Sequence, residues 1–368
     1  MKILCAIHGP ADGATAVYLN ASRRAEFLRR RGCTVDLVSP ADLAGGRWPR
    51  LQPLLLPVAL ASSPLAAYDV IVFHSYLAWA HHVFSGRRGR AATIVAFHGL
   101  EPLYHEAVEA ELARTGERLS ARFRLLHLGV MPQLLRLACR HADRVLCLNA
   151  REKAYVESHG WAPPSRVAVV ANGVEAELFQ PRHHAPRATR LLFVGQWLRA
   201  KGSRYLADAF PRIVASCPDV ELACIGTGTD ESVVRACFSA DVRERVRVVR
   251  RVDRAGLAVE LASADIFLFP SLSEGFSGAL LEALAAGLPA VTTEAGAAAD
   301  LLVDGRQAVV VPFADAAALA NAVVALVDDR DRRRQLGAAA QAMARCFEWD
   351  RVNEQFAAEL SAAAGARA

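Results

Sequence analysis

The chain has 368 residues, of which 53% are hydrophobic and 22% are charged, and its formal net charge is +5. This length exceeds what one hydrophobic core usually organises, so we expect two domains of roughly 150 to 200 residues each. The balance of apolar and charged residues excludes a disordered chain, and the modest positive charge gives no indication of nucleic-acid binding.

The N-terminal half alternates short apolar runs with longer helical patterns, which is typical of a parallel sheet with crossover helices. The first run, at residues 2–7, leads into a glycine-containing turn, and a helical pattern extends from about residue 16 to residue 31. Because His8, Gly9 and Pro10 interrupt the first run, we expect a strand there and not a signal peptide. The next strands are expected at residues 33–40, 69–75, 92–99, 143–149 and 166–173.

Two features indicate the compartment. The apolar stretch at residues 51–65 is too short, and contains too many prolines, to cross a bilayer as a helix. The eight cysteines are scattered without a CxxC pair, which fits neither a disulfide framework nor a zinc site. We therefore expect a cytoplasmic protein without a metal site.

Residues 114–140 form a basic stretch in which arginines alternate with leucines and Phe123. The arginines are Arg114, Arg118, Arg122, Arg124, Arg136 and Arg140. Such a basic amphipathic region could lie against an anionic membrane surface or face an anionic acceptor. The alternative is a solvated helix face over an ordinary core.

Residues 175–190 show no clear periodicity, and their two prolines predict an interdomain linker. We interpret the adjacent His183 and His184 as surface residues of this linker, because neighbours in sequence rarely face one metal. The alternating pattern then restarts, with strands expected at 189–197, 221–226, 245–252, 264–271, 288–293 and 307–313 and helices near 316–327 and 331–344. The predicted fold class is α/β, with Rossmann-like domains at residues 1–180 and 188–345.

A loop and a helix follow the strand expected at residues 264–271. The sequence GALLEALAA is so rich in strong helix formers that a helix is expected to begin near Ser277, which would cap it. The first-turn N–H groups, at Gly278, Ala279 and Leu280, would point into the crevice beyond the sheet, where the helix dipole favours phosphate. This helix start therefore predicts an anion site.

Two carboxylates flank the predicted anion site. Glu274 lies in the loop, whereas Glu282 projects from the second turn of the helix. One carboxylate could reach the sugar of a ligand while the other accepts two hydrogen bonds from a ribose diol. The spacing therefore suits a nucleotide bound across the start of the helix.

The run EGFSGALLE, in which seven residues separate Glu274 from Glu282, resembles the E-x7-E signature of family 4 retaining glycosyltransferases. The flanking sequences LFPSLSEGF and LLEALAAGLPAV resemble the same family. The resemblance implies the GT-B architecture, in which two Rossmann-like domains face a central cleft. It also implies that Glu274 contacts hydroxyls of the donor sugar and that Glu282 holds the ribose. The alternative is a surface loop and helix with two solvated glutamates.

A second block, LLFVGQWLRAKG at residues 191–202, resembles the strand and loop in which this family carries an arginine and, five residues later, a lysine-glycine pair. Lys201 occupies the lysine position, whereas Gln196 occupies the arginine position. Arg199 is a candidate replacement for the missing cation. A lysine and an arginine beside a diphosphate would stabilise the charge of the leaving group without a metal. Either cation could instead be an ordinary surface residue.

Two N-terminal turns resemble the family less closely. The sequence GPADGATA at residues 9–16 is similar to the loop whose paired glycines approach the donor phosphate, with Gly13 kept and Asp12 in place of the first glycine. FHGLE at residues 97–101 resembles the family's strand-end His-Gly, which would place His98 near the transferred sugar as a hydrogen-bond partner. His98 could otherwise be only a turn residue.

The C-terminal residues 346–368 contain FEWDRVNEQF, which resembles the helix that crosses back to pack on the N-terminal domain in this family. Trp349 would anchor this helix. The alternative is a tail helix that docks on its own domain.

The resemblance implies a retaining glycosyltransferase that transfers a hexosyl group from a nucleotide-diphosphate sugar to an acceptor hydroxyl, without a cofactor. By analogy, the expected acceptor is a cell-surface glycan or glycolipid, reached at the inner face of the membrane. Two alternatives stay open. Gln196 and Asp12 favour a weakly active or inactive sugar-nucleotide-binding subunit. CIGTGTD at residues 224–230 favours a nicotinamide oxidoreductase, but Glu231 stands where that fingerprint has its third glycine.

Overall fold

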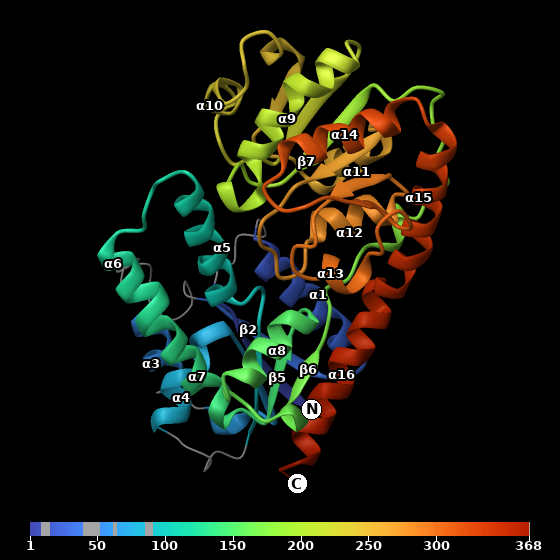
Figure 1. Cartoon of the computed structure of the whole chain (residues 1–368). Coiled ribbons are helices and arrows are strands. Elements are labelled where there is room, and N and C mark those ends of the chain that lie inside the picture. Colours follow the sequence, from blue (N-terminus) through green and yellow to red (C-terminus); the bar gives the residue numbers. More distant parts are fainter. Residues whose placement is uncertain (9–14, 40–51, 62–64, 85–90, 368) are drawn as a thin grey trace. The chain divides into compact units, whose positions relative to one another are not determined.

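The computed structural model describes residues 1–8, 15–39, 52–61, 65–84 and 91–367. The chain divides into two compact units (Figure 1). The N-terminal unit contains residues 1–105, 118–173 and 349–368, and the C-terminal unit contains residues 106–117 and 174–348. Within the described residues, each unit has one six-stranded parallel sheet. This observation confirms the predicted α/β class with two Rossmann-like units.

The sheet of the N-terminal unit has the strand order β2-β1-β3-β4-β5-β6. Its strands are β1 (Lys2–Ala6), β2 (Thr34–Val38), β3 (Val70–His74), β4 (Ala92–Ala96), β5 (Arg144–Cys147) and β6 (Val167–Val169). The helices are α1 (Ala16–Arg30), α3 (Gln52–Ala61), α4 (Ala78–Phe84), α5 (Glu101–Arg114), α6 (Ala121–Phe123), α7 (Met131–His141), α8 (Ala150–Ser158) and α16 (Trp349–Gly365). Residues 106–114 of α5 belong to the C-terminal unit. A π-helix, Arg124–Val130, joins α6 to α7.

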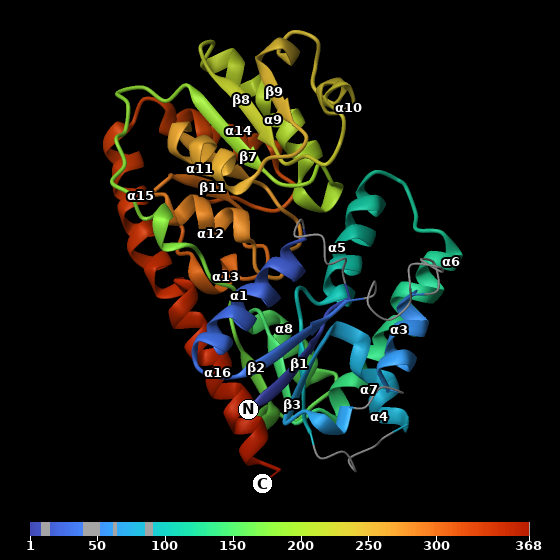
Figure 2. The same ribbon diagram turned by 180° about the vertical axis from the view of Figure 1, so that it is seen from behind.

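Helices cover both faces of this sheet, as the nearly continuous apolar strands predict. On one face, Ile71, Phe73 and Val95 pack with buried residues of α3, α4 and α7. The opposite face carries α1 and α16, which contact each other and lie beside the strands (Figure 2). Alternation of side chains along each strand therefore supplies two apolar layers from one set of strands.

The C-terminal unit has the strand order β12-β11-β10-β7-β8-β9. Its strands are β7 (Arg190–Val194), β8 (Glu221–Ile225), β9 (Val246–Val249), β10 (Ile266–Phe269), β11 (Ala290–Thr292) and β12 (Val309–Val310). Its helices are α9 (Ser203–Ser216), α10 (Glu231–Ala236), α11 (Arg254–Ser263), α12 (Gly278–Ala285), α13 (Ala298–Leu301), α14 (Ala316–Val327) and α15 (Arg330–Ala344). The order reverses between β7 and β10, and open α/β sheets bind ligands beyond the strand ends at such a point.

Two apolar clusters fill the two faces of the second sheet. Leu191 and Phe193 of β7 pack with buried residues of α9 and α14. Leu192 and Val194 of the same strand pack with Leu280 and other buried residues of α12. The alternation along β7 thus anchors α12 on one face of the sheet, and this helix carries four of the predicted donor-binding residues, Gly278, Ala279, Leu280 and Glu282.

The C-terminal helix α16 packs on the N-terminal unit, as the family resemblance implied. Arg24 of α1 places its guanidinium over the ring of Phe356, 4.6 Å from the ring centroid. Its Nη2 also donates a 3.1 Å hydrogen bond to the carbonyl of Ala171. At the start of α16, the ring of Trp349 lies against Gly173, where a Cβ atom would approach the ring to 2.5 Å.

Residues 174–189 belong to the C-terminal unit, so the division between the units falls before the expected boundaries at residues 180 and 188. Arg182 donates hydrogen bonds of 3.0 Å to the carbonyl of Leu261 and 3.2 Å to that of Ala286. His184 is buried, so the prediction that it is a surface linker residue is wrong. These contacts fix a segment whose sequence has no helical or strand periodicity.

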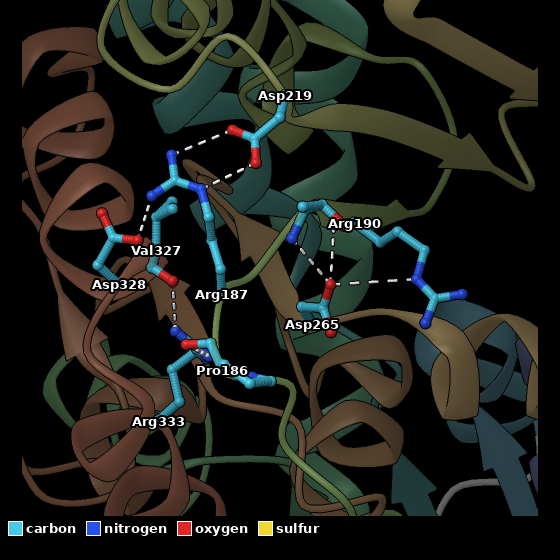
Figure 3. A network of polar contacts seen from close by, with 9 residues as sticks. Pro186, Arg187, Arg190, Asp219, Asp265, Val327, Asp328 and Arg333 are labelled. Carbon is cyan, nitrogen blue, oxygen red and sulfur yellow. Dashed lines mark hydrogen bonds and ion pairs between the residues drawn. The ribbon is translucent and has the colours of Figure 1, made fainter.

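Figure 3 shows how polar groups hold the end of this segment where β7 begins. Arg187 makes two hydrogen bonds to Asp219, of 2.8 and 3.1 Å, and an ion pair with Asp328. The buried Arg333 donates to the carbonyl oxygens of Val327 and Pro186. Asp265, just before β10, accepts the backbone N–H groups of residues 189 and 190 at 2.9 Å. The network therefore ties the start of β7 to the start of β10.

Candidate functional site

The candidate site of the C-terminal unit begins where β7 and β10 end, at the reversal of strand order. Lys201 follows β7 and Glu274 follows β10. The Nζ atom of Lys201 donates to both carboxylate oxygens of Glu274, at 2.6 and 2.7 Å. The hydroxyl of the buried Ser271 donates to Oε1 of the same carboxylate. The structure thus brings together two residues that lie 73 positions apart and that the sequence motifs predicted independently.

Gly202 explains how the two loops approach so closely. Its φ is +70°, and a Cβ atom at this position would lie 1.8 Å from the carbonyl oxygen of Pro270. The loop after β7 therefore contacts the backbone of the loop after β10 at a point where only glycine fits. On the other side, Gly296 (φ +57°) lies against the backbone of Glu274. These contacts hold the loop that carries Lys201 against the loop that carries Glu274.

The start of α12 has the predicted geometry. Ser277 caps the helix, because its hydroxyl accepts the N–H of Leu280 at 3.2 Å. Gly278 is exposed, and no atom lies within 4 Å of the position that its Cβ would occupy. In the described part of the chain, the first turn at Gly278 and Ala279 therefore has open space beside it, and the N-terminal end of a helix dipole favours an anion there.

Glu282 lies in the second turn of α12 and its side chain is 16% exposed. The Nη2 atom of Arg254, the first residue of α11, lies 3.4 Å from Oε1 of Glu282 and 3.2 Å from Oε1 of Glu175. Burial raises the pKa of Glu282, the Arg254 charge lowers it, and Glu175 raises it again. The sequence analysis did not single out Arg254 or Glu175, because a contact between three distant segments leaves no local pattern.

Gln196, which occupies the family's arginine position, and Arg199, the candidate replacement cation, lie in the loop after β7. Gln196 is exposed and comes two residues after the end of β7. Arg199 forms an ion pair with Glu117 at 2.6 Å and donates to the hydroxyl of Thr115 at 3.4 Å. The Arg199 guanidinium would have to leave this pair to neutralise a diphosphate. Its role as a replacement cation stays a prediction.

In the N-terminal unit, histidines lie at the ends of three neighbouring strands. His98 and His74 are hydrogen-bonded through Nε2 and Nδ1 at 2.6 Å, and the ring of His8 lies 6.4 Å from that of His98. Burial lowers the pKa of His74 and of His98 well below the usual value, so both rings are neutral at pH 7. Nδ1 of His98 is buried without a hydrogen-bond partner among the described residues. One nitrogen of this ring can therefore serve a ligand.

The residue after His74 adds a second feature to this strand end. Ser75 has a φ of +56°, which is uncommon for a residue other than glycine. Its hydroxyl donates to Glu101, a carboxyl group whose pKa burial raises. His74, Ser75 and Glu101 were not among the residues predicted from the sequence. Their position at or beyond a strand's carboxyl end is a signal that could have identified the first two. Asp12 and Gly13 lie outside the described residues.

No group of three or more histidine, cysteine, aspartate or glutamate side chains in the described ranges is arranged to hold a metal ion. The turn at Gly226 and Gly228 connects β8 to α10 without a dinucleotide fingerprint. The site chemistry therefore consists of a lysine-carboxylate pair, a second carboxylate with its arginine, and the free end of a helix.

Comparison with family models decides the identity. Residues 20–178 match the model described as Glycosyltransferase Family 4, and residues 188–329 match the model described as Glycosyl transferases group 1. The chain belongs to glycosyltransferase family 4. The E-x7-E residues Glu274 and Glu282 of this glycosyltransferase lie within the second matched region.

Curated relatives match about half of this chain. A phosphatidyl-myo-inositol mannosyltransferase of Mycobacterium leprae is 36% identical over 193 residues, which cover 50% of this chain and 51% of the relative. A D-inositol 3-phosphate glycosyltransferase of Pseudarthrobacter chlorophenolicus is 31% identical over 225 residues, which cover 57% and 54%. The chain thus spans about half the length of the curated relatives it matches.

Solved structures share the GT-B fold over nearly the whole chain. A sucrose-phosphate synthase from Thermosynechococcus elongatus superposes with a TM-score of 0.80 at 20% identity, covering 97% of each chain. Anabaena HepE, solved in complex with UDP-glucose, gives a TM-score of 0.72 at 18% identity and covers 98% of this chain and 99% of HepE. These likenesses establish the architecture of the glycosyltransferase.

The arginine-rich region, residues 114–140, extends from the last residue of α5 through α6 and the π-helix into α7. Its arginines at positions 114, 118, 122, 124, 136 and 140 are all exposed. Leu125, Leu126 and Val130 of the π-helix are 70%, 45% and 41% exposed. An ordinary helix face over a core would bury such side chains, so the π-helix combines apolar and cationic groups on its exposed surface, whereas α7 buries Leu135, Ala138 and Cys139. No helix in the described part of the chain is long and apolar enough to cross a membrane.

Proposed function

We propose that this family 4 glycosyltransferase transfers a hexosyl group, with retention of configuration, from a nucleotide-diphosphate sugar to an acceptor hydroxyl. The observation that carries the proposal is the Lys201–Glu274 pair at the reversal of strand order, beside the open first turn of α12. Anion-binding and hydroxyl-binding groups are thereby combined at the edge where such sheets bind nucleotides.

The C-terminal unit would hold the donor. The diphosphate would lie against the N–H groups of Gly278 and Ala279, Glu274 would accept hydrogen bonds from sugar hydroxyls, and Glu282 would accept them from the ribose. Lys201 can keep its pair with Glu274 during binding, because an ammonium group has three N–H donors and two are used. The third can reach the diphosphate.

In the transfer step, the bond between the anomeric carbon and the leaving phosphate oxygen breaks. The acceptor oxygen forms its bond to the anomeric carbon on the same face, and the acceptor proton passes to the leaving phosphate oxygen. Negative charge grows on the diphosphate during this step, and Lys201 and the dipole of α12 would stabilise it. This scheme needs neither a carboxylate nucleophile nor a cofactor.

For the acceptor we propose a glycolipid or glycan at the cytoplasmic face of a membrane. The names of the mannosyltransferase and inositol-phosphate relatives support a glycolipid or inositol-containing acceptor. The exposed leucines of the π-helix and the arginines around them support peripheral contact with an anionic bilayer. His98, with a neutral ring and a free nitrogen, would hydrogen-bond the transferred sugar.

Transfer is tested by incubating the full chain with UDP- and GDP-hexoses and phosphatidylinositol, and by following nucleoside diphosphate release and glycolipid formation. We expect a product whose anomeric configuration, measured by NMR, equals that of the donor. Calorimetric binding of a nucleotide sugar without transfer to any acceptor would instead support an inactive subunit, which Gln196 in place of the expected arginine favours. Inversion at the anomeric carbon would contradict the retaining mechanism.

Membrane contact is tested by co-sedimentation with phosphatidylglycerol and phosphatidylcholine vesicles. We expect binding to the anionic vesicles only, with a decrease at high salt. A Leu125→Ser/Leu126→Ser variant should lose most of this binding, whereas a Val233→Ser variant on exposed α10 serves as a matched control. Equal sedimentation of the wild type with both vesicles, or with neither, contradicts the proposed contact.

A further inference from the structure

The three charged side chains around Glu282 come from three separate segments of the C-terminal unit. Arg254 begins α11, Glu175 lies in the segment after β6, and Glu282 lies on α12. One nitrogen of the guanidinium, Nη2, lies 3.4 Å from Glu282 and 3.2 Å from Glu175. The side chains of Glu282 and Glu175 are only 16% and 21% exposed, so one partly exposed arginine pairs with two largely buried carboxylates.

We propose that Arg254 is a positioning residue for the donor: it holds Glu282 in one orientation and in its ionised form, so that this carboxylate can accept both ribose hydroxyls. The inference rests on the proposed nucleotide-sugar function. Arg254 would act through Glu282 and not by touching the sugar that is transferred. Glu175 would compete with Glu282 for the same guanidinium and so tune its charge.

The electrostatics agree with this geometry. Burial raises the pKa of Glu282 most strongly, Arg254 opposes this effect, and Glu175 reinforces it. Among the described residues, the charged groups that shift the pKa of Glu282 are thus Arg254 of α11 and Glu175 of the segment after β6. Without Arg254, the negative charge of Glu175 would act on Glu282 without the opposing effect of this guanidinium, and Glu282 would take up a proton more readily.

Protonation of Glu282 would weaken nucleotide binding for a definite reason. An ionised carboxylate accepts two hydrogen bonds from a diol, whereas a protonated one turns one oxygen into a donor. In an Arg254→Gln variant, the pKa of Glu282 rises, so binding should weaken as the pH falls and recover as it rises. A residue with only a structural role would not produce this pH dependence.

The test is calorimetric titration of the full chain with UDP and with GDP at pH 6 and pH 8.5. For Arg254→Gln we expect the Kd of whichever nucleotide binds the wild type to rise about tenfold at pH 6 and about threefold at pH 8.5, because protonation of Glu282 adds to the loss of its orientation only at the lower pH. Arg254→Lys should retain most of the affinity. Arg254→Gln/Glu175→Gln should regain part of it, because the repelling carboxylate is gone.

Two controls separate the outcomes. Arg334→Gln removes an exposed arginine that pairs with Asp331 on α15 and should leave the Kd unchanged. The 2′-deoxy nucleotide should bind the wild type more weakly than the ribonucleotide, and this preference should shrink in Arg254→Gln.

Equal affinity of Arg254→Gln and the wild type for the nucleotide at both pH values overturns the inference about Arg254 and leaves the proposed function intact. A loss that is the same at both pH values and is not relieved by Glu175→Gln also overturns it. Absence of nucleotide binding by the wild type overturns the proposed function with it.

Discussion

Lys201 and Glu274 form a two-contact ion pair at the ends of the two central strands of the C-terminal sheet, 2.6 and 2.7 Å from Nζ to the two oxygens. Ser271 adds a third polar contact, because its hydroxyl donates a hydrogen bond to the Glu274 carboxylate. If each residue acts on the reacting donor, removing either one should reduce the rate of transfer much more than it reduces stability.

Lys201→Ala and Glu274→Ala should each lower kcat for transfer by about two to three powers of ten, as expected for loss of one preorganised electrostatic group. Lys201→Ala should raise the KM for the donor as well, because the diphosphate loses a cation in the ground state. Lys153→Ala, which removes an i,i+4 ion pair with Glu157 and a hydrogen bond to the carbonyl of Val167, is the control for the loss of a lysine outside the site. Normal turnover by either site variant, measured as nucleoside diphosphate release, would count decisively against these roles.

Gly202→Ala should disrupt the loop contact on which the ion pair depends. The new Cβ would lie 1.8 Å from the backbone oxygen of Pro270, so one loop must move. Gly226→Ala is a matched control with nearly the same φ, +71°, and with no atom within 4 Å of its Cβ position. We expect the control to lose about 1 kcal/mol of unfolding free energy from its left-handed conformation, and Gly202→Ala to lose clearly more. Equal unfolding free energies of the two variants in urea titrations would show that the two loops move apart at little energetic cost.

Much of this arrangement could be predicted from the sequence, because strands, caps and the E-x7-E spacing are local features. All twelve strands expected from apolar periodicity occur, although the structure makes them shorter. The pairing of Arg254 with Glu282 and of His98 with His74 could not be predicted, since each joins segments whose approach depends on the whole sheet. The division at residue 174 was also missed. Arg182 holds that segment in place by hydrogen bonds to the backbone carbonyls of Leu261 and Ala286. Every residue has such a carbonyl group, so no sequence pattern indicates these contacts.

The buried His82 of α4 gives the N-terminal unit a measurable acid sensitivity. Burial lowers its pKa to about 4, and its Nε2 lies 3.3 Å from the hydroxyl of Thr93. Below about pH 6.5 the unfolded chain takes up a proton at this histidine, whereas the folded chain does so only near pH 4. Protonation therefore favours unfolding, and the stability contributed by the neutral ring is present above pH 6.5 and is lost as the pH falls to 4.

His82→Gln should make the unfolding free energy of the N-terminal unit less dependent on pH near pH 5. The slope should decrease by about 1.4 kcal/mol per pH unit, the value for one proton. Urea unfolding followed by tryptophan fluorescence at several pH values from 4.5 to 8 measures it. At pH 8 the ring is neutral in both the folded and the unfolded state. The difference in unfolding free energy between the variant and the wild type at this pH therefore measures the effect of the changed packing alone. Parallel pH profiles of variant and wild type would contradict a neutral buried His82.

Gln196→Arg tests whether the glycosyltransferase lacks a cation that its site can use. Gln196 is exposed in the loop after β7, five residues before Lys201, and Arg199 is engaged by Glu117. A guanidinium at position 196 could form a bidentate contact with a diphosphate, so we expect the Kd for UDP or GDP to fall about three- to tenfold. Glu117→Gln, which releases Arg199, should produce a smaller gain if Arg199 is the substitute. If Gln196→Arg leaves affinity unchanged while Glu117→Gln increases it, the wild-type site draws its second cation from Arg199. If both variants bind as the wild type does, Lys201 and the start of α12 suffice for the diphosphate.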